Sequence, residues 1–191
     1  DLLDNNRINL TYKIEESEIA EVSKIIILGN EIFSDSKIKS IMKTKERTIL
    51  RFFSSADRYD PDKLEYDKQL VTEFYNNNGY PEFKFTSSIA QLSFNKNDFE
   101  IILSVSEGNE YNFGEIKVTN ELKKMDSNLV KNSLPFKSGD LFNSSQIKDS
   151  IEQIKDTAEL SGYSFIEIRP LLDTNTEQKI VNLEILINEG P

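Results

Sequence analysis

The sequence predicts an α+β protein made of two tandem βααββ units, each a three-stranded mixed sheet covered on one face by two helices. Three repeated features indicate this architecture. Helical patterns end at Gly79-Tyr80 and again at Gly162-Tyr163. Runs of alternating apolar residues close at Glu107-Gly108 and again at Glu189-Gly190. Both units also begin with a short apolar run, and a repeat on this scale indicates one supersecondary unit copied in tandem.

The repeat divides the chain into three parts. Residues 18–108 form the first unit and residues 109–191 the second. Residues 1–17 are interpreted as the end of a preceding unit, because Ile8 to Glu16 resembles a further copy of the final strand. We therefore expect the chain to be part of a longer protein. Each unit has room for only a small core, so we expect the two to support each other at their junction.

Apolar spacing and capping residues predict the first strand and both helices of the first unit. Ile25 to Leu28 is a short apolar run ended by a Gly-Asn turn, as in a buried strand. Ser34 or Asp35 is suited to cap a short helix. Asp60 and Pro61 begin a longer one, because proline at the first helical position forfeits no hydrogen bond. The predicted apolar faces are Ile38, Ile41 and Met42 on the short helix and Leu64, Leu70, Val71, Phe74 and Tyr75 on the long one.

A hairpin closes the first unit. Its first arm runs from Phe83 to Phe94, and its second alternates apolar residues from Phe99 to Val105. In the first arm Phe83, Phe85 and Ile89 are expected to face the core, whereas Leu92 and Phe94 have the opposite parity. Such a change of phase predicts a β-bulge near Ser87-Ser88. We expect the second arm to be the central strand and the first arm to lie at a free edge.

The second unit repeats this order. Asn143 is suited to cap its long helix, and Gly162 ends that helix. The expected inward positions are Ile116 and Val118 on the first strand, Leu129 and Val130 on the short helix, Ile147, Ile151, Ile154 and Ala158 on the long helix, and Ile166, Ile168, Val181, Leu183, Ile185 and Ile187 on the hairpin.

Composition excludes several classes of function. With 23 basic and 33 acidic residues, the net charge of −10 opposes binding to nucleic acid and to anionic lipid surfaces. No apolar stretch approaches the roughly 20 residues of a membrane-spanning helix. The chain has no histidine and no cysteine, which removes the common catalytic triads and thiolate metal sites. Carboxylates leave glycoside hydrolysis and calcium binding formally open, but no calcium-loop pattern is present. We predict no enzyme, no cofactor and no metal site.

Several segments at fixed spacings resemble a known family. They are Ile27-Leu28-Gly29-Asn30-Glu31-Ile32-Phe33-Ser34, then Phe74-Tyr75 with Gly79-Tyr80, then Glu107-Gly108. Together with the βααββ order they resemble the POTRA (polypeptide-transport-associated) domain of the BamA family of outer-membrane protein assembly factors. The second unit departs from this pattern, with Thr119 in place of the usual glycine and no Phe-Tyr before Gly162. The linkage 107–111 and the long first unit look most like the third and fourth domains of a five-domain array.

The resemblance implies a non-catalytic module on the periplasmic face of the outer membrane of a Gram-negative bacterium, ahead of a membrane-embedded β-barrel in the full protein. The implied partners are unfolded outer-membrane β-barrel proteins and accessory assembly lipoproteins. Two alternatives stay open. POTRA-like units of secretion-partner transporters and cell-division proteins dock one specific folded partner, and a purely structural spacer would only hold accessory lipoproteins.

Two segments are candidate binding sites. The first is the edge strand, which would accept a client strand by β-strand addition or would simply be a protected edge. Its residues are Phe83, Phe85, Ser87, Ser88, Ile89, Ala90 and Gln91. The second is the connection from Thr44 to Tyr59, whose apolar residues either dock a partner or fold back onto their own core. These are Ile49, Leu50, Phe52 and Phe53.

Two further features concern the boundary between the units. Asn76-Asn77-Asn78 is interpreted as helix-end and turn chemistry, with a polar contact as the alternative. Few residues separate the last strand of the first unit from the next strand, while Gly108 and Gly114 leave some backbone freedom. We therefore expect a restricted hinge.

Overall fold

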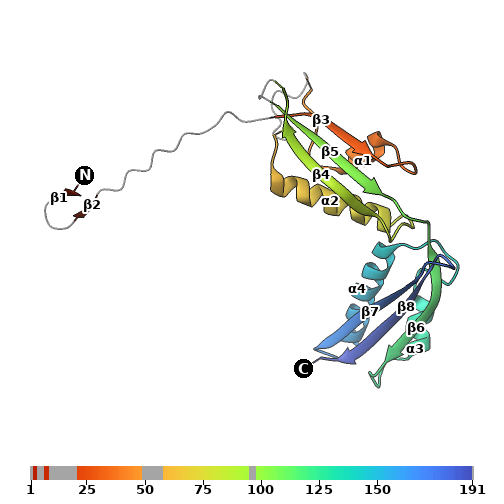
Figure 1. Ribbon diagram of the computed structural model, residues 1–191. Helices are drawn as coiled ribbons and strands as arrows, with labels where there is room; N and C mark the ends of the chain where they lie inside the picture. Colours follow the sequence, from red (N-terminus) through yellow and green to blue (C-terminus); the bar gives the residue numbers. More distant parts are fainter. Residues whose placement is uncertain (1, 4–6, 9–20, 49–57, 95–97, 191) are drawn as a thin grey trace.

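The computed structural model describes residues 2–3, 7–8, 21–48, 58–94 and 98–190, and it contains two βααββ units in succession (Figure 1). The first unit consists of β3 (Glu21–Leu28), α1 (Asp35–Ile41), α2 (Pro61–Asn76), β4 (Lys84–Leu92) and β5 (Asp98–Ser106). The second consists of β6 (Asn112–Asn120), α3 (Ser127–Ser133), α4 (Ser144–Leu160), β7 (Ile166–Asn175) and β8 (Ile180–Glu189). The predicted α+β architecture is confirmed.

The last strand of each unit is the central one. The strand orders are β3-β5-β4 and β6-β8-β7. β3 runs parallel to β5 and β6 parallel to β8, whereas β4 and β7 pair antiparallel with their hairpin partners. Both sheets are therefore mixed, and β4 and β7 each have one side without a partner strand. The expectation of a central final strand is correct.

A short antiparallel pair lies at the N-terminus. It joins β1 (Leu2–Leu3) to β2 (Arg7–Ile8), with Leu2 opposite Ile8. Of the segment interpreted as the last strand of a preceding unit, only Ile8 belongs to the described residues. The assignment of residues 1–17 to a preceding unit thus stays a prediction.

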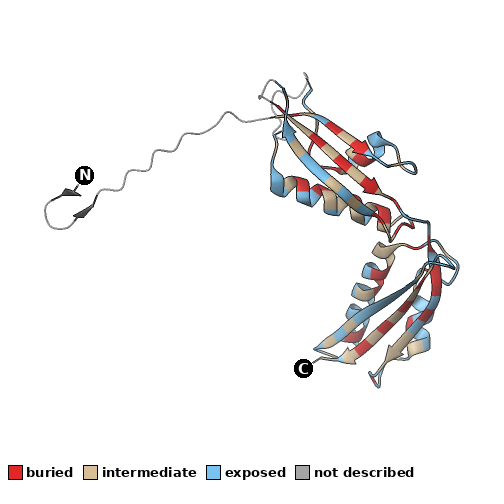
Figure 2. Cartoon of the chain, viewed as in Figure 1, coloured by how far each residue is buried: buried red, intermediate tan, exposed pale blue. Residues whose placement is uncertain are grey.

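The core of the first unit lies between the central strand and α2 (Figure 2). Ile101 and Leu103 on β5 and Val71 and Tyr75 on α2 are fully buried, which strand alternation and helical spacing explain. Phe74 packs against this cluster from its margin. Leu70 is half-buried and lies outside it, so its expected place in the apolar stripe is wrong.

Asp67 occupies the position on α2 that sequence reasoning missed. It is fully buried, and its carboxylate accepts the backbone N–H groups of Lys43 and Thr44, the latter at 2.9 Å. These donors follow the C-terminal end of α1, and the Thr44 N–H would otherwise be buried without a partner, which is costly. Asp67 therefore fastens the end of α1 to the middle of α2.

The predicted helix boundaries are confirmed. Ser34 and Asp60 cap α1 and α2, and the Asp60 carboxylate accepts the Asp62 N–H at 2.9 Å. The Asn143 side chain caps α4 by accepting the Ser145 N–H at 3.0 Å. Gly79 and Gly162 follow the long helices at φ +93° and +92°, a backbone region that glycine adopts without strain.

Glu107, from the Glu-Gly pair that closes the last strand of each unit, connects three elements of the first unit. Its carboxylate, at the end of β5, accepts the N–H groups of Glu31 (2.7 Å) and Ile32 (3.0 Å) and the Tyr75 hydroxyl (2.7 Å). Burial acts to raise the pKa of Glu107, but these donors outweigh burial and hold the pKa below its ordinary value. One buried carboxylate thus joins β5, the loop after β3 and the end of α2.

The second unit lacks this arrangement. Ala158 stands where the first unit has Tyr75, and Glu189 is exposed. Its core is formed instead by Phe113, Phe136 and Phe142 together with the predicted residues of β8 and α4. On α3, Val130 is buried but Leu129 is 72% exposed, so the expectation that Leu129 faces inward is wrong.

Candidate functional site

The free side of β4 presents unpaired backbone groups. In an antiparallel pair, residues alternate between bonding their partner and pointing away from it. Ser93 donates its N–H to Asp98 at 2.7 Å, and from there the register continues without a break to Ser87 opposite Ser104. The alternation therefore directs the N–H groups of Ser88 and Ala90 away from β5, toward the open edge.

The predicted bulge in β4 is present, slightly earlier than expected. The register shifts between Phe85 and Ser87, which leaves Thr86 without a place in the ladder. Before the bulge Phe85 faces the helices. After it, Ser88 and Ala90 share that face, because they stand opposite the buried Leu103 and Ile101. Ile89 consequently points to the helix-free face and is 48% exposed, so its expected inward orientation is wrong.

Phe83 does not belong to the accessible edge. It precedes β4, is 5% exposed, and stacks on Tyr75 with ring centroids 3.9 Å apart. Its role as a client-binding residue is therefore corrected to that of a core residue. Phe94 is fully exposed and follows the end of the strand. The other predicted edge residues, Phe85, Ser87, Ser88, Ile89, Ala90 and Gln91, all belong to β4, and Leu92 at the end of this strand is 50% exposed as well.

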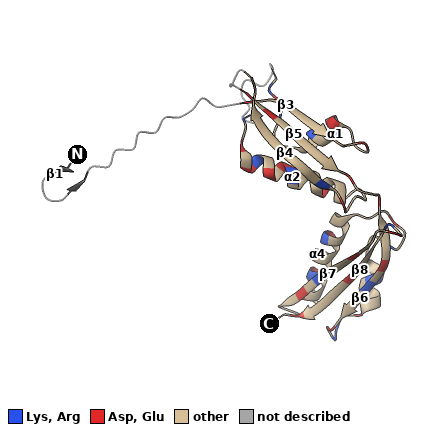
Figure 3. Ribbon diagram, viewed as in Figure 1, with Lys and Arg blue, Asp and Glu red and all other residues tan. Residues whose placement is uncertain are grey.

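A groove runs between α2 and the edge strand. Glu65, Gln69, Thr72 and Glu73 of α2 line one wall together with Lys68, and Phe85 of β4 lines the other. No charged residue lies on β4 between Phe85 and Leu92, where the ribbon is tan, whereas α2 carries both signs (Figure 3). The edge thus combines an uncharged backbone with a hydrophilic helix face beside it.

The corresponding edge of the second unit is interrupted by a proline. β7 keeps an unbroken register with β8, and Gly190 donates its N–H to Phe165 at 3.0 Å. By the same alternation, the nitrogen of Pro170 points toward the open side, where proline has no hydrogen to donate. Glu167, Arg169 and Asp173 add charge to this strand. Proline and charge are common protections of an edge strand. Pro170, which lies within a predicted strand, is the sequence signal from which this protection could have been predicted.

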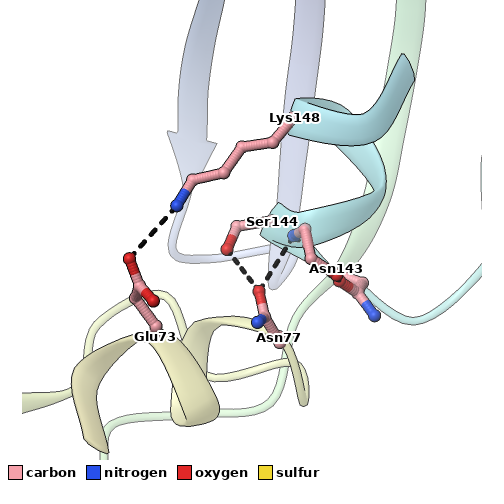
Figure 4. Close-up of polar contacts among 6 residues, drawn as sticks. Glu73, Asn77, Asn143, Ser144 and Lys148 are labelled. Atoms are coloured by element: carbon pink, nitrogen blue, oxygen red, sulfur yellow. Dashed lines mark hydrogen bonds and ion pairs between the residues drawn. The ribbon is translucent and has the colours of Figure 1, made fainter. Parts of the chain in front are cut away.

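The two units meet through the end of α2 and the start of α4 (Figure 4). The Asn77 side-chain oxygen accepts the Ser144 hydroxyl at 2.6 Å and the Ser145 N–H at 2.9 Å. One turn away on each helix, Lys148 pairs with Glu73 at 3.2 Å. Asn77 therefore ends its own helix and supplements the cap of a helix in the other unit. Both the turn interpretation and the polar-contact alternative for Asn76-Asn77-Asn78 apply.

Backbone contacts reinforce this junction. Tyr111, just before β6, donates its N–H to Gly79 at 2.8 Å, and its carbonyl accepts the Phe142 N–H at 2.9 Å. Leu141 of the second unit approaches so closely that a Cβ on Gly79 would lie 2.6 Å from its Cδ1. Gly79 thus serves both the helix end and the contact between units.

We expect Asn77→Ala to broaden the distribution of angles between the units, because the variant removes the acceptor of two bonds that cross the junction. Small-angle scattering and residual dipolar couplings measure this distribution. Asn78→Ala is the matched control, since Asn78 donates only to Phe74 within its own helix. Equal couplings in Asn77→Ala and the parent would show that the backbone contacts alone hold the orientation.

The second candidate site cannot be placed, since Ile49, Leu50, Phe52 and Phe53 lie outside the described residues. Among the helices that the structure describes, none has the length and apolar character needed to cross a membrane. Within residues 21–48, 58–94 and 98–190, no cluster of three acidic side chains is arranged to hold a metal ion.

Comparisons with known proteins agree on one family. The POTRA family profile, described as "Surface antigen variable number repeat", matches residues 20–108 and 111–190. The chain is 25% identical over 168 residues to the outer membrane protein assembly factor BamA of Neorickettsia risticii, covering 88% of this chain and 22% of that protein. It is 26% identical over 188 residues to BamA of Neisseria meningitidis, covering 98% of this chain and 24% of that protein. The chain thus spans about a quarter of the length of these relatives.

Solved structures share the fold. BamA POTRA3-5 of Haemophilus influenzae superposes with a TM-score of 0.74 at 22% identity, over 91% of this chain and 68% of that one. BamA of Haemophilus ducreyi lacking POTRA domains 1-3 gives a TM-score of 0.64 at 14% identity, over 89% of this chain and 29% of that one. At these identities the likeness is one of fold.

Proposed function

Because this chain belongs to the POTRA family, we propose that it is a non-catalytic module of an outer-membrane protein assembly factor of the BamA type. In this proposal it works on the periplasmic face of the outer membrane of a Gram-negative bacterium. The first unit binds unfolded β-barrel precursors by adding an extended segment of the client to β4. Residues 18–108 and 109–191 correspond to the third and fourth domains of such an array, and accessory lipoproteins are further partners.

The contrast between the equivalent hairpin edges, β4 and β7, carries this proposal. Ser88 and Ala90 offer outward N–H groups on the part of β4 after Lys84, which has no charged residue, whereas β7 has Pro170 and three charged residues at the equivalent edge. Backbone groups pair with any extended chain, whatever its side chains. Such a site suits a module that handles many different clients. Affinity is expected to be weak, because ordering a disordered client offsets most of the gain.

Amide chemical shifts of the two-unit protein, titrated with a peptide copied from a barrel strand, test the proposal. We expect the largest shifts along residues 85–92 and in the neighbouring β5, and little change in β7, because Pro170 interrupts the outward donors of β7 and charged residues flank it. The control is the same peptide with a central proline, which cannot complete the ladder. Shifts confined to the second unit, or none at millimolar peptide, would contradict strand addition at β4.

A further inference from the structure

We propose that the groove between α3 and α4 of the second unit docks an amphipathic helix of a partner protein, one that carries basic residues beside its apolar stripe. This inference goes beyond the proposed function, because it gives the chain a second interaction surface and does not depend on strand addition at β4. Three observations carry it: the two helices are not tied to each other as in the first unit, the walls between them are apolar, and one margin of the groove is acidic.

The groove is a cavity of about 320 Å³ that lies between the two helices. Its apolar lining is made by Met125, Leu129, Val130 and Leu134 on the side of α3 and by Ile154 on α4. Leu129 is 72% exposed, so an apolar side chain stands open to solvent beside the groove. Along α4 the lining extends over residues 150–161, which is about 16 Å at the rise of an α-helix. The groove thus has room for about three turns of a second helix.

A difference between the two units explains why this groove is open. In the first unit, the Asp67 carboxylate accepts the N–H groups of Lys43 and Thr44 and so ties α2 to the end of α1. Ser150 stands at the position of Asp67, the same number of residues before the glycine that ends the long helix. Pro135, which has no N–H, follows the cap of α3 where Lys43 follows the cap of α1. The second unit therefore lacks the acceptor of this tie and one of its donors.

The hydroxyl groups that line the groove do not make it a polar site. On α4, the hydroxyls of Ser150, Thr157 and Ser161 donate to carbonyl oxygens four residues earlier in the same helix, at 2.7, 2.8 and 2.9 Å. On α3, the Ser133 hydroxyl donates to the Val130 carbonyl at 2.7 Å. These donors are already used, so the walls offer mainly carbon surface. An extended chain would find no strand edge to pair with here, whereas a helix bonds its own backbone and needs only apolar contact.

The margin of the groove on α4 is acidic. Asp149 and Asp156 lie on the same side of the helix as Gln153, at helical spacing, and both carboxylates are exposed. Within the part of the chain that the structure describes, neither carboxylate forms an ion pair. Lysine or arginine beside the apolar stripe of a partner helix would bring opposite charge to this margin. The carboxylate of a fatty acid would be repelled there, so the charge favours a basic helix over an acyl chain.

Amide chemical shifts of the two-unit protein test this site, with a helical peptide as the probe. The peptide has about 15 residues, repeats leucine at the spacing of one helix face and carries lysine beside the leucines. We expect shifts in residues 124–134 and 150–161, and Leu129→Ser should bind at least about fivefold more weakly because it removes an apolar contact. Leu171→Ser is the matched control: Leu171 is 49% exposed on the face of the second sheet that no helix covers, so this variant should bind as the parent does.

An exchange of charge tests the occupant. A second peptide, with glutamate in place of every lysine, is expected to bind the parent at least about fivefold more weakly than the first. The double variant Asp149→Lys with Asp156→Lys should reverse this preference, since it changes the sign of the acidic margin and leaves the apolar walls unchanged. Both positions are exposed, and circular dichroism of the variant checks that the second unit stays folded.

The remaining outcomes would overturn the proposal. Equal binding of the two peptides, or a preference that the double variant does not change, would remove the acidic margin as the recognition element and with it the basic helix. Binding of decanoate, but of neither peptide, would make an acyl chain the occupant. Shifts confined to other parts of the chain, or none at millimolar peptide, would remove the site itself. Amide shifts along β4 with a barrel-strand peptide are read separately, so failure here leaves strand addition untouched.

Discussion

Replacing Ser88 or Ala90 with proline is expected to weaken binding of barrel-derived peptides at least about tenfold while the first unit stays folded. Each substitution deletes one outward N–H and places a ring at the edge, which hinders the added strand. The ladder with β5 keeps its bonds, because neither residue donates to that strand. Affinity measured by amide shifts, and folding measured by circular dichroism, are read on the same samples.

Two control variants complete this experiment. Ser88→Thr changes the side chain but keeps the N–H, so it should bind as the parent does. Pro170→Ala restores the missing donor of β7 and should give the second unit weak peptide binding that it otherwise lacks. If folded Ser88→Pro and Ala90→Pro variants both bound as well as the parent, edge addition would be the wrong mechanism. The segment with Ile49, Leu50, Phe52 and Phe53 would then be the leading candidate.

Replacing Glu107 with alanine is expected to lower the free energy of unfolding of the first unit by about 2–4 kcal/mol. The variant leaves the N–H groups of Glu31 and Ile32 and the Tyr75 hydroxyl without their acceptor, and an unmet buried donor costs about 1–3 kcal/mol. Urea unfolding measures this loss. Glu189→Ala is the matched control: its carboxylate is exposed, so the change should stay within about 0.5 kcal/mol.

The same contact predicts a dependence on pH. The pKa of Glu107 is lowered by folding from an ordinary value of 4.5, so its ionised form is favoured in the folded state. The contribution is fully present above the unfolded pKa and is lost as the pH falls through the lower, folded pKa. Below pH 4.5 the parent should therefore lose stability more steeply than Glu107→Gln. If the stability of the two proteins fell equally below pH 4.5, the pKa of Glu107 would not differ between the folded and the unfolded state.

Local signals predicted most of the fold. Asp60-Pro61 marked the start of α2 and Gly79 its end, because capping depends on a few neighbouring residues. Strict alternation predicted β5 and β8 and the residues with which they face the core. Asp67 escaped prediction because a carboxylate on an apolar face is recognisable only once its donors, 23 and 24 residues away, are in place.

The candidate site was predicted less completely. The edge itself followed from the order of elements, but the facing of Ile89 depends on the position of the bulge, and a bulge one residue away reverses every later side chain. The bonds of Asn77 to Ser144 and Ser145 join residues 67 and 68 apart in sequence. The spacing of apolar residues does not indicate a contact of that kind, because the contact depends on how two separately folded units meet.

Glu73 lines the groove beside β4 and also pairs with Lys148 across the junction between the units. A client side chain that bonds Glu73 competes with Lys148 for the same carboxylate. Occupancy of the groove and the angle between the units are then thermodynamically linked. The linkage is reciprocal: an orientation of the second unit that releases Glu73 raises the affinity for the client by the same factor by which client binding favours that orientation. Both partners are more than half exposed, so the exchange is worth at most about fivefold in affinity.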